Sequence, residues 1–192
     1  MNPRNIFLFV LIILLNGCSS KEHLIFDGIP IDGHTVKFAS ELTRAGFSIS
    51  DSTIKNEIIL SGKFLGKDCK ISVLGTSKNN LVYKVIVEFP EEVNDSLEHS
   101  FEKMQKLLSS TYGNGMTRYR QYKNPERFMF NERALKRQIM KGDYSRYNNG
   151  SGIVTMEVQD GFISISYLDK INNDIRKKNM AEENKEETDE EI

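Results

Sequence analysis

Five short segments of alternating apolar and polar residues place the strongest constraint on the fold of this chain. They are residues 58–64, 67–74, 81–89, 153–158 and 162–168. In an extended backbone, such a period of two puts the apolar side chains on one face. Asp160-Gly161 between the last two segments is typical of a tight hairpin turn. The pattern predicts an antiparallel sheet with one covered face.

Two amphipathic segments are expected to supply the helices that cover this face. Phe38 and Leu42 recur at helical spacing before Gly46. A second apolar stripe, in a helix expected from about 94 to 112, comprises Leu97, Phe101, Met104 and Leu108. A third helix is predicted over about 125–141, with a strand as the alternative. The predicted fold class is α+β: an antiparallel sheet with helices packed on one face, followed by a C-terminal β-hairpin.

The N-terminus carries an apolar run, residues 6–15, preceded by Arg4 and followed by Gly17-Cys18. The run is shorter than the about 20 apolar residues that a transmembrane helix needs, and its length is typical of a signal-peptide core. An ordinary cleaved signal is one alternative. A small residue before cysteine resembles the lipobox of bacterial lipoproteins, which implies cleavage before Cys18 and lipidation of Cys18.

The segment after Cys18 bears on the predicted location. Ser19-Ser20 follow the cysteine, whereas an aspartate there would resemble an inner-membrane retention signal of Gram-negative lipoproteins. The resemblance therefore implies an outer-membrane lipoprotein, on the periplasmic side or at the cell surface.

The chain divides by composition into a signal, a tether, a domain and a tail. The last part holds seven acidic residues against Lys185 within 182–191 and has little to bury, which is typical of disorder. The domain is either one unit or two subunits, about 23–90 and 91–171. The predicted ranges are 1–17 for the signal peptide, 18–22 for the tether, 23–171 for the α+β domain and 172–192 for the disordered acidic tail.

The first unit resembles known lipoprotein modules in the run FDGIPIDGHTVKFASELTRAGF and the three predicted strands after it. Its helix-then-meander order is similar to that of SmpA/OmlA/BamE lipoproteins and of the β-lactamase inhibitory protein. The chain also resembles uncharacterised bacterial lipoproteins in its Gly-Ile-Pro-Ile-Asp-Gly motif and in the run GFISISYLDKINN. Neither resemblance implies a catalytic residue.

No arrangement of residues in the sequence indicates a catalytic, metal or cofactor site. His23, His34 and His99 lack the spacing of metal ligands, and they are interpreted as surface or turn residues. Cys69 alternates with apolar strand residues, so it is predicted to be a buried thiol rather than a nucleophile. We therefore expect no metal and no cofactor.

Residues 116–147 are unusually basic, with nine lysines and arginines against three acidic residues. Three interpretations stay open: a solvated face, a contact with the acidic tail, and a patch for an anionic envelope ligand. That ligand would be lipopolysaccharide, an acidic glycan or an acidic protein face. The predicted location in the cell envelope argues against nucleic acid. The candidate patch comprises Arg118, Arg120, Lys123, Arg127, Arg133, Lys136, Arg137 and Lys141.

The predicted envelope location, the compact α+β scaffold and the lack of a catalytic arrangement in the sequence together favour a non-enzymatic binding or assembly module for another envelope component. The alternative is an envelope enzyme whose site is not recognisable from the sequence. A deep pocket with converging polar groups would favour the enzyme. A broad sheet face would favour the binding module.

Overall fold

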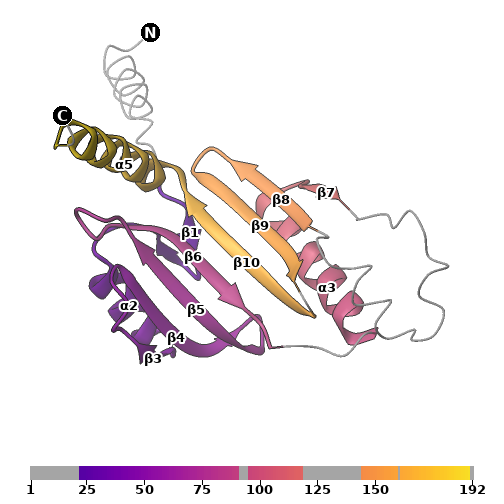
Figure 1. Cartoon of the computed structure of the whole chain (residues 1–192). Helices are drawn as coiled ribbons and strands as arrows, with labels where there is room; N and C mark the ends of the chain where they lie inside the picture. Colours follow the sequence, from indigo (N-terminus) through magenta and orange to yellow (C-terminus); the bar gives the residue numbers. More distant parts are fainter. Residues whose placement is uncertain (1–21, 91–94, 119–143, 160, 191–192) are drawn as a thin grey trace, which may run out of the picture.

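The computed structural model describes residues 22–90, 95–118, 144–159 and 161–190. Within these ranges the chain repeats one order of elements, a helix followed by four strands, and ends in a further helix (Figure 1). After the short hairpin β1 (Ile25–Phe26) and β2 (Ile29–Pro30), the first half comprises α2 (Thr35–Arg44), β3 (Ser48–Asp51), β4 (Glu57–Phe64), β5 (Lys67–Gly75) and β6 (Val82–Glu88). The second half comprises α3 (Asp95–Tyr112), β7 (Met116–Arg118), β8 (Tyr144–Asn149), β9 (Gly152–Gln159) and β10 (Phe162–Asp169), and α5 (Lys170–Glu190) follows.

The two halves share one eight-stranded sheet of order β3-β4-β5-β6-β10-β9-β8-β7. All of its neighbouring strands are antiparallel, and the halves join where β6 pairs with β10. The predicted α+β fold with an antiparallel sheet is confirmed. The hairpin of β9 and β10 lies inside this sheet rather than after it, and α5 follows the hairpin.

The core lies between the sheet and the helices α2 and α3, which cover the same face (Figure 1). Phe38 and Leu42 of α2 and Phe101 of α3 belong to one buried core. That core also contains the strand residues that point to this face of the sheet, such as Ile71 and Ile165. The alternation and the two apolar stripes thus account for one packed layer of helices on one face of the sheet.

The prediction of a disordered tail over 172–192 is wrong for residues 172–190, which belong to α5. Three local contacts stabilise this polar helix. The Asp169 carboxylate accepts a hydrogen bond from the Asn172 amide in the first turn of the helix, as a capping residue does. The Arg176 guanidinium lies 5.0 Å from the centre of the Tyr83 ring, and Lys78 forms a 3.0 Å ion pair with Glu182. Composition does not reveal the last two contacts, because Tyr83 and Lys78 lie about a hundred residues earlier in the sequence.

Several described strands lie outside the five predicted segments, and β8 and β3 show the physical reason. Polar side chains dominate β8, whose Ser145 and Tyr147 are nevertheless buried while Arg146 between them is exposed. The short edge strand β3 carries mostly exposed side chains, so its sequence has no alternation to detect. The predicted signal peptide and the predicted helix or strand over 125–141 lie outside the described residues, as does the tether apart from Glu22.

Candidate functional site

The face of the sheet opposite α2 and α3, here called the open face, has no helix packed over its centre within the described ranges (Figure 1). Strand register arranges its side chains in three rows across the strands. The first row is Ser61, Lys70, Glu88, Ser164, Glu157 and Tyr144. The second is Ile59, Ser72, Ile86, Ser166, Thr155 and Arg146. The third is Leu74, Lys84, Leu168 and Ile153.

Short hydroxyl side chains occupy the centre of the open face. Ser72 and Ser164 are only 8% and 7% exposed, although no described helix covers them, because larger neighbours surround them. Ser166 and Thr155 complete this central group and are partly exposed. A hydroxyl both donates and accepts hydrogen bonds, so the centre is suited to polar groups of either kind.

The open face is large enough for a macromolecular contact. Eight strands about 4.8 Å apart give a width of about 34 Å, and three rows of side chains give a length of about 20 Å. The resulting area of about 700 Å² is close to the about 800 Å² that each partner buries in a standard protein–protein interface.

Charged side chains flank the hydroxyl centre on both sides. Lys70 and Glu88 form a 3.7 Å ion pair whose side chains are 53% and 40% exposed. Exposed pairs of this kind contribute little to stability, so a partner can displace them at low cost. On the other side, a hollow of about 250 Å³ is lined by Tyr144, Arg146, Thr155 and Glu157.

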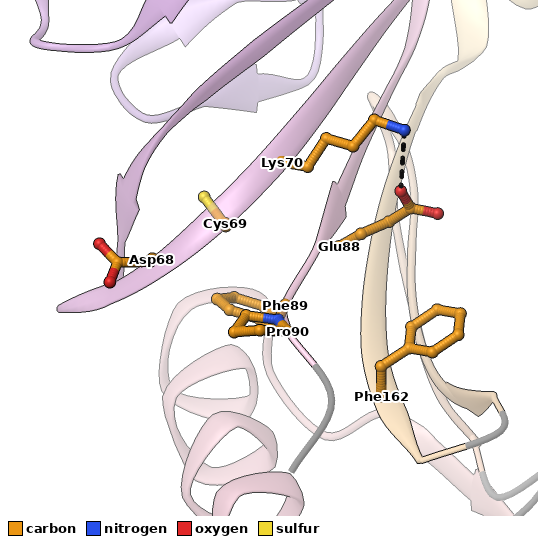
Figure 2. A pocket seen from close by; sticks show the side chains of 7 residues that line it. All are labelled: Asp68, Cys69, Lys70, Glu88, Phe89, Pro90 and Phe162. Atoms are coloured by element: carbon orange, nitrogen blue, oxygen red, sulfur yellow. Dashed lines mark ion pairs between the residues drawn. The ribbon is translucent and has the colours of Figure 1, made fainter.

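A larger cavity of about 430 Å³ lies at one end of the sheet, where β5 and β10 begin and β6 ends (Figure 2). This volume is within the range of ligand pockets. Its Lys70 and Glu88 also belong to the first row of the open face, so the end cavity continues that face. It is lined by Asp68, Cys69, Lys70, Glu88, Phe89, Pro90 and Phe162.

The basic patch predicted from the sequence lies almost entirely outside the described residues. Arg118 belongs to β7, and Arg146, at the end of the same basic segment, is exposed on the open face. The patch residues outside the described ranges are Arg120, Lys123, Arg127, Arg133, Lys136, Arg137 and Lys141. Lipidation of Cys18 also stays a prediction.

The three histidines occupy different environments. His34 is the N-cap of α2, where its Nδ1 accepts a hydrogen bond from the Val36 amide, and His99 is exposed on α3. His23 is not a free surface residue: its ring is 23% exposed and lies between the carboxylates of Asp169 and Asp32. The described part of the chain holds no group of three side chains suited to bind a metal ion.

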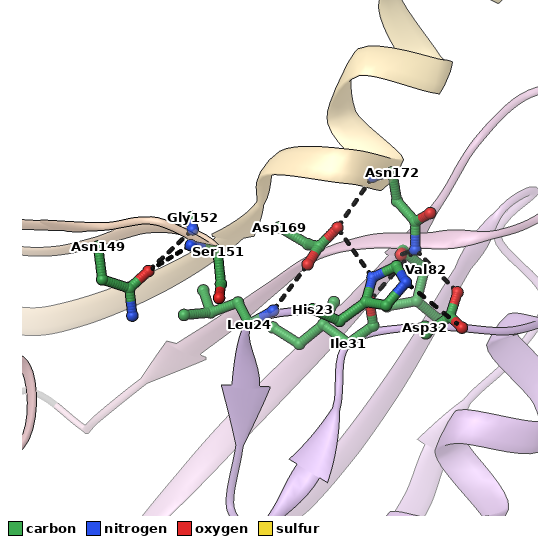
Figure 3. Close-up of polar contacts among 10 residues, drawn as sticks. All are labelled: His23, Leu24, Ile31, Asp32, Val82, Asn149, Ser151, Gly152, Asp169 and Asn172. Carbon is green, nitrogen blue, oxygen red and sulfur yellow. Dashed lines mark hydrogen bonds and ion pairs between the residues drawn. The ribbon is translucent and has the colours of Figure 1, made fainter. Parts of the chain in front are cut away.

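His23 is part of a cluster, here called the N-terminal latch, that comprises His23, Leu24, Asp169 and Asn172 (Figure 3). The fully buried Asp169 carboxylate accepts hydrogen bonds from the amides of Leu24 (2.8 Å) and Asn172 (2.9 Å), and His23 Nδ1 lies 3.2 Å from it. The Asn172 side chain donates to the carbonyls of Ile31 (3.2 Å) and Val82 (2.8 Å).

Asp32 lies beside the latch. His23 Nε2 is 3.6 Å from its carboxylate, and the Asn172 amide donates to it at 3.3 Å. Partial burial acts to raise the pKa of Asp32, but hydrogen bonds from Gly33 and Asn172, together with nearby His23 and Lys37, hold it below the ordinary value. The carboxylate therefore keeps its charge at neutral pH.

No protein-family model, no curated protein and no solved structure matches this chain. The resemblances to lipoprotein modules stay predictions. None of the described helices has the length and apolar character required to cross a bilayer.

Cys69 is a buried strand residue with 7% of its surface exposed, as predicted from its alternation with apolar neighbours. Burial raises the pKa of its thiol to about 11, and the adjacent Asp68 carboxylate adds to this effect. The thiolate is the reactive form, so the native protein holds Cys69 in its unreactive state at neutral pH.

We expect the native domain to react slowly with the thiol reagent DTNB. At pH 7.5 the rate should be at least about 100-fold below that of the urea-unfolded chain, whose thiol has a pKa near 8.5. The native rate should increase by about tenfold per pH unit as the thiolate fraction increases below pH 11. Complete reaction of native Cys69 within seconds at pH 7.5 would contradict a protonated, buried thiol.

Proposed function

We propose that this chain is an outer-membrane lipoprotein, anchored at Cys18, that binds another envelope protein on the open face of its sheet. It acts as a non-enzymatic binding or assembly module, on the periplasmic side or at the cell surface. The observation that carries the proposal is the open face itself. Eight strands present three ordered rows of side chains with the two helices α2 and α3 on the other side.

The composition of the open face supports a protein partner. Its centre offers hydroxyl groups, its flanks offer both signs of charge, and apolar side chains such as Ile86 and Leu168 lie between them. Protein–protein interfaces combine the same ingredients. An acidic glycan or lipopolysaccharide would instead favour a face of one charge, whereas Lys70 and Arg146 are matched here by Glu88 and Glu157.

The alternative function, an envelope enzyme, would use the end cavity. Two observations favour binding over catalysis there. Its Cys69 thiol is protonated at neutral pH, and Phe89, Pro90 and Phe162 supply an apolar lining. Such a lining suits an apolar side chain of a partner more than a reacting polar group.

Site-specific photo-crosslinking tests the proposal in intact cells. A benzophenone amino acid placed at Ser72 or at Ser166 should yield the same crosslinked protein, because the two positions lie in one row of the open face. The matched controls are Lys37 of α2 and Lys103 of α3, which are exposed on the helical layer. They should yield no such product.

A blocking variant makes the test specific to the face. Ser166→Arg places a long side chain in the hydroxyl centre and should remove the crosslink formed from Ser72, with no loss of the folded state by circular dichroism. Equal crosslinking from Lys37 and Lys103, or none from either open-face position, would overturn the proposal.

A further inference from the structure

We infer that the end of the sheet where β10 meets α5 contacts the lipid headgroups of the bilayer. The N-terminal latch holds this end against the bilayer. This end, here called the anchor end, comprises Asp169, α5 and the turns at 77–80 and 150–151. The inference rests on the proposed anchoring at Cys18.

The first step is that the latch fixes the start of the domain to the anchor end. The Leu24 amide donates to the buried carboxylate of Asp169, and the His23 ring contacts the same carboxylate (Figure 3). Leu24 itself is 1% exposed, and the Leu24 carbonyl accepts from the Ile31 amide. Charge-assisted hydrogen bonds in a buried setting are stronger than neutral surface bonds, so residue 23 has a fixed place on the domain.

The second step is the reach of the chain between the anchor and the latch. Five peptide steps join Cys18 to His23 and span at most about 18 Å when fully extended. The eight residues of β10 lead from the anchor end to the end cavity over about 26 Å. The anchor end is therefore the part of the domain that the tether draws to the bilayer, and the end cavity points away from it.

The third step is the surface that the anchor end presents. Helix α5 runs across this end from β10 to the β5–β6 turn, where Ser77 donates to Glu183 at 2.8 Å and Lys78 pairs with Glu182. The Lys170 amide also donates to the carbonyl of Ser151 in the β8–β9 turn. The first half of α5 is basic, with Lys170, Arg176, Lys177 and Lys178 against Asp174, and this is the half that anionic headgroups attract. The second half of α5 is acidic.

This arrangement has a consequence for the proposed binding role. In this orientation the strands point away from the bilayer, and the open face lies along one side of the domain. The end cavity is the part of that face farthest from the membrane. A partner in the envelope space therefore reaches the open face without displacing lipid.

A nanodisc experiment tests the orientation with a chemically supplied anchor. Residues 18–192 are coupled through the Cys18 thiol to a maleimide lipid, and mass spectrometry verifies attachment at Cys18 alone. The nanodiscs contain phosphatidylcholine, phosphatidylglycerol and a gadolinium-chelate lipid, with a lutetium-chelate lipid as the diamagnetic control. Methyl-labelled isoleucines report the distance of each end from the headgroups.

We expect strong paramagnetic broadening of the Ile171 and Ile175 methyls on α5 and weak broadening of Ile163 near the end cavity. The effect falls with the sixth power of distance, and the length of β10 should make the difference at least about tenfold. Equal broadening at both ends, or stronger broadening at Ile163, would overturn the inference. Failure of Cys18 lipidation in cells would leave this result unchanged, so the two proposals fail separately.

Two variants test whether the tether and latch cause the orientation. A flexible glycine–serine segment of about ten residues inserted between Lys21 and Glu22 lengthens the tether by about 33 Å without touching the described fold. It should reduce the difference between the two ends at least about threefold. His23→Gln, which keeps a polar side chain but removes the ring, should reduce it as well. An undiminished difference in the insertion variant would overturn the role given to the tether and latch.

Discussion

Replacement of Phe101 by alanine is expected to lower the free energy of unfolding by about 3–5 kcal/mol. The ring is 1% exposed and lies in the core between α3 and the sheet, so its removal forfeits buried apolar surface and leaves a cavity. Urea denaturation followed by circular dichroism measures the change, provided that the dependence on urea concentration is the same in both proteins.

The matched control is Glu102→Ala, one position along the same helix. Glu102 is exposed, so this substitution should change the free energy of unfolding by no more than about 0.5 kcal/mol. A loss below about 1 kcal/mol for Phe101→Ala would mean that α3 does not pack on the sheet as described.

Replacement of Cys18 by serine is expected to abolish the lipid anchor. The proposed acyl chains contribute about 0.8 kcal/mol for each buried methylene, and serine has no thiol to carry them. Detergent phase partitioning of cell extracts should place the wild-type protein in the detergent phase. The Cys18→Ser protein should either stay unprocessed at its signal or enter the aqueous phase.

Cys69→Ser serves as the control, because it removes the other cysteine of the chain and should leave partitioning unchanged. Wild-type protein in the aqueous phase would refute anchoring at Cys18. Detergent partitioning of Cys18→Ser with its signal removed would show that another part of the chain attaches it to the membrane.

The elements that the sequence predicts well are those whose residues alternate or recur with a strong period. In strands such as β5 and β10 the apolar core residues occupy every second position, and α3 buries one continuous stripe, so each carries a local signal. The edge strand β3 buries little, which leaves nothing for periodicity to detect. The helix α5 also contacts Tyr83 and Lys78, distant partners that no local pattern within it reveals.

The candidate site was accessible to sequence reasoning only in part. The polar positions of β6, Lys84 and Glu88, indicate that one face of the sheet meets solvent, and Cys69 was correctly predicted to be buried. The extent of the open face depends on the pairing of β6 with β10, which joins distant segments. The latch was equally hidden, because Leu24 and Asp169 are 145 residues apart in the sequence.

The junction of β6 and β10 also affects how the protein is made. Synthesis proceeds from the N-terminus, so β3 to β6 emerge as a complete meander while the chain from Phe89 to Gly161 is still to follow. Until β10 arrives, β6 is an edge strand with unpaired backbone amides and carbonyls, a known site of wrong pairing. Closing the sheet then requires a contact of long sequence separation, which folds slowly. Until β10 pairs with β6, the incomplete sheet therefore has an edge at which other chains can pair, and the last strand of the sheet removes that edge.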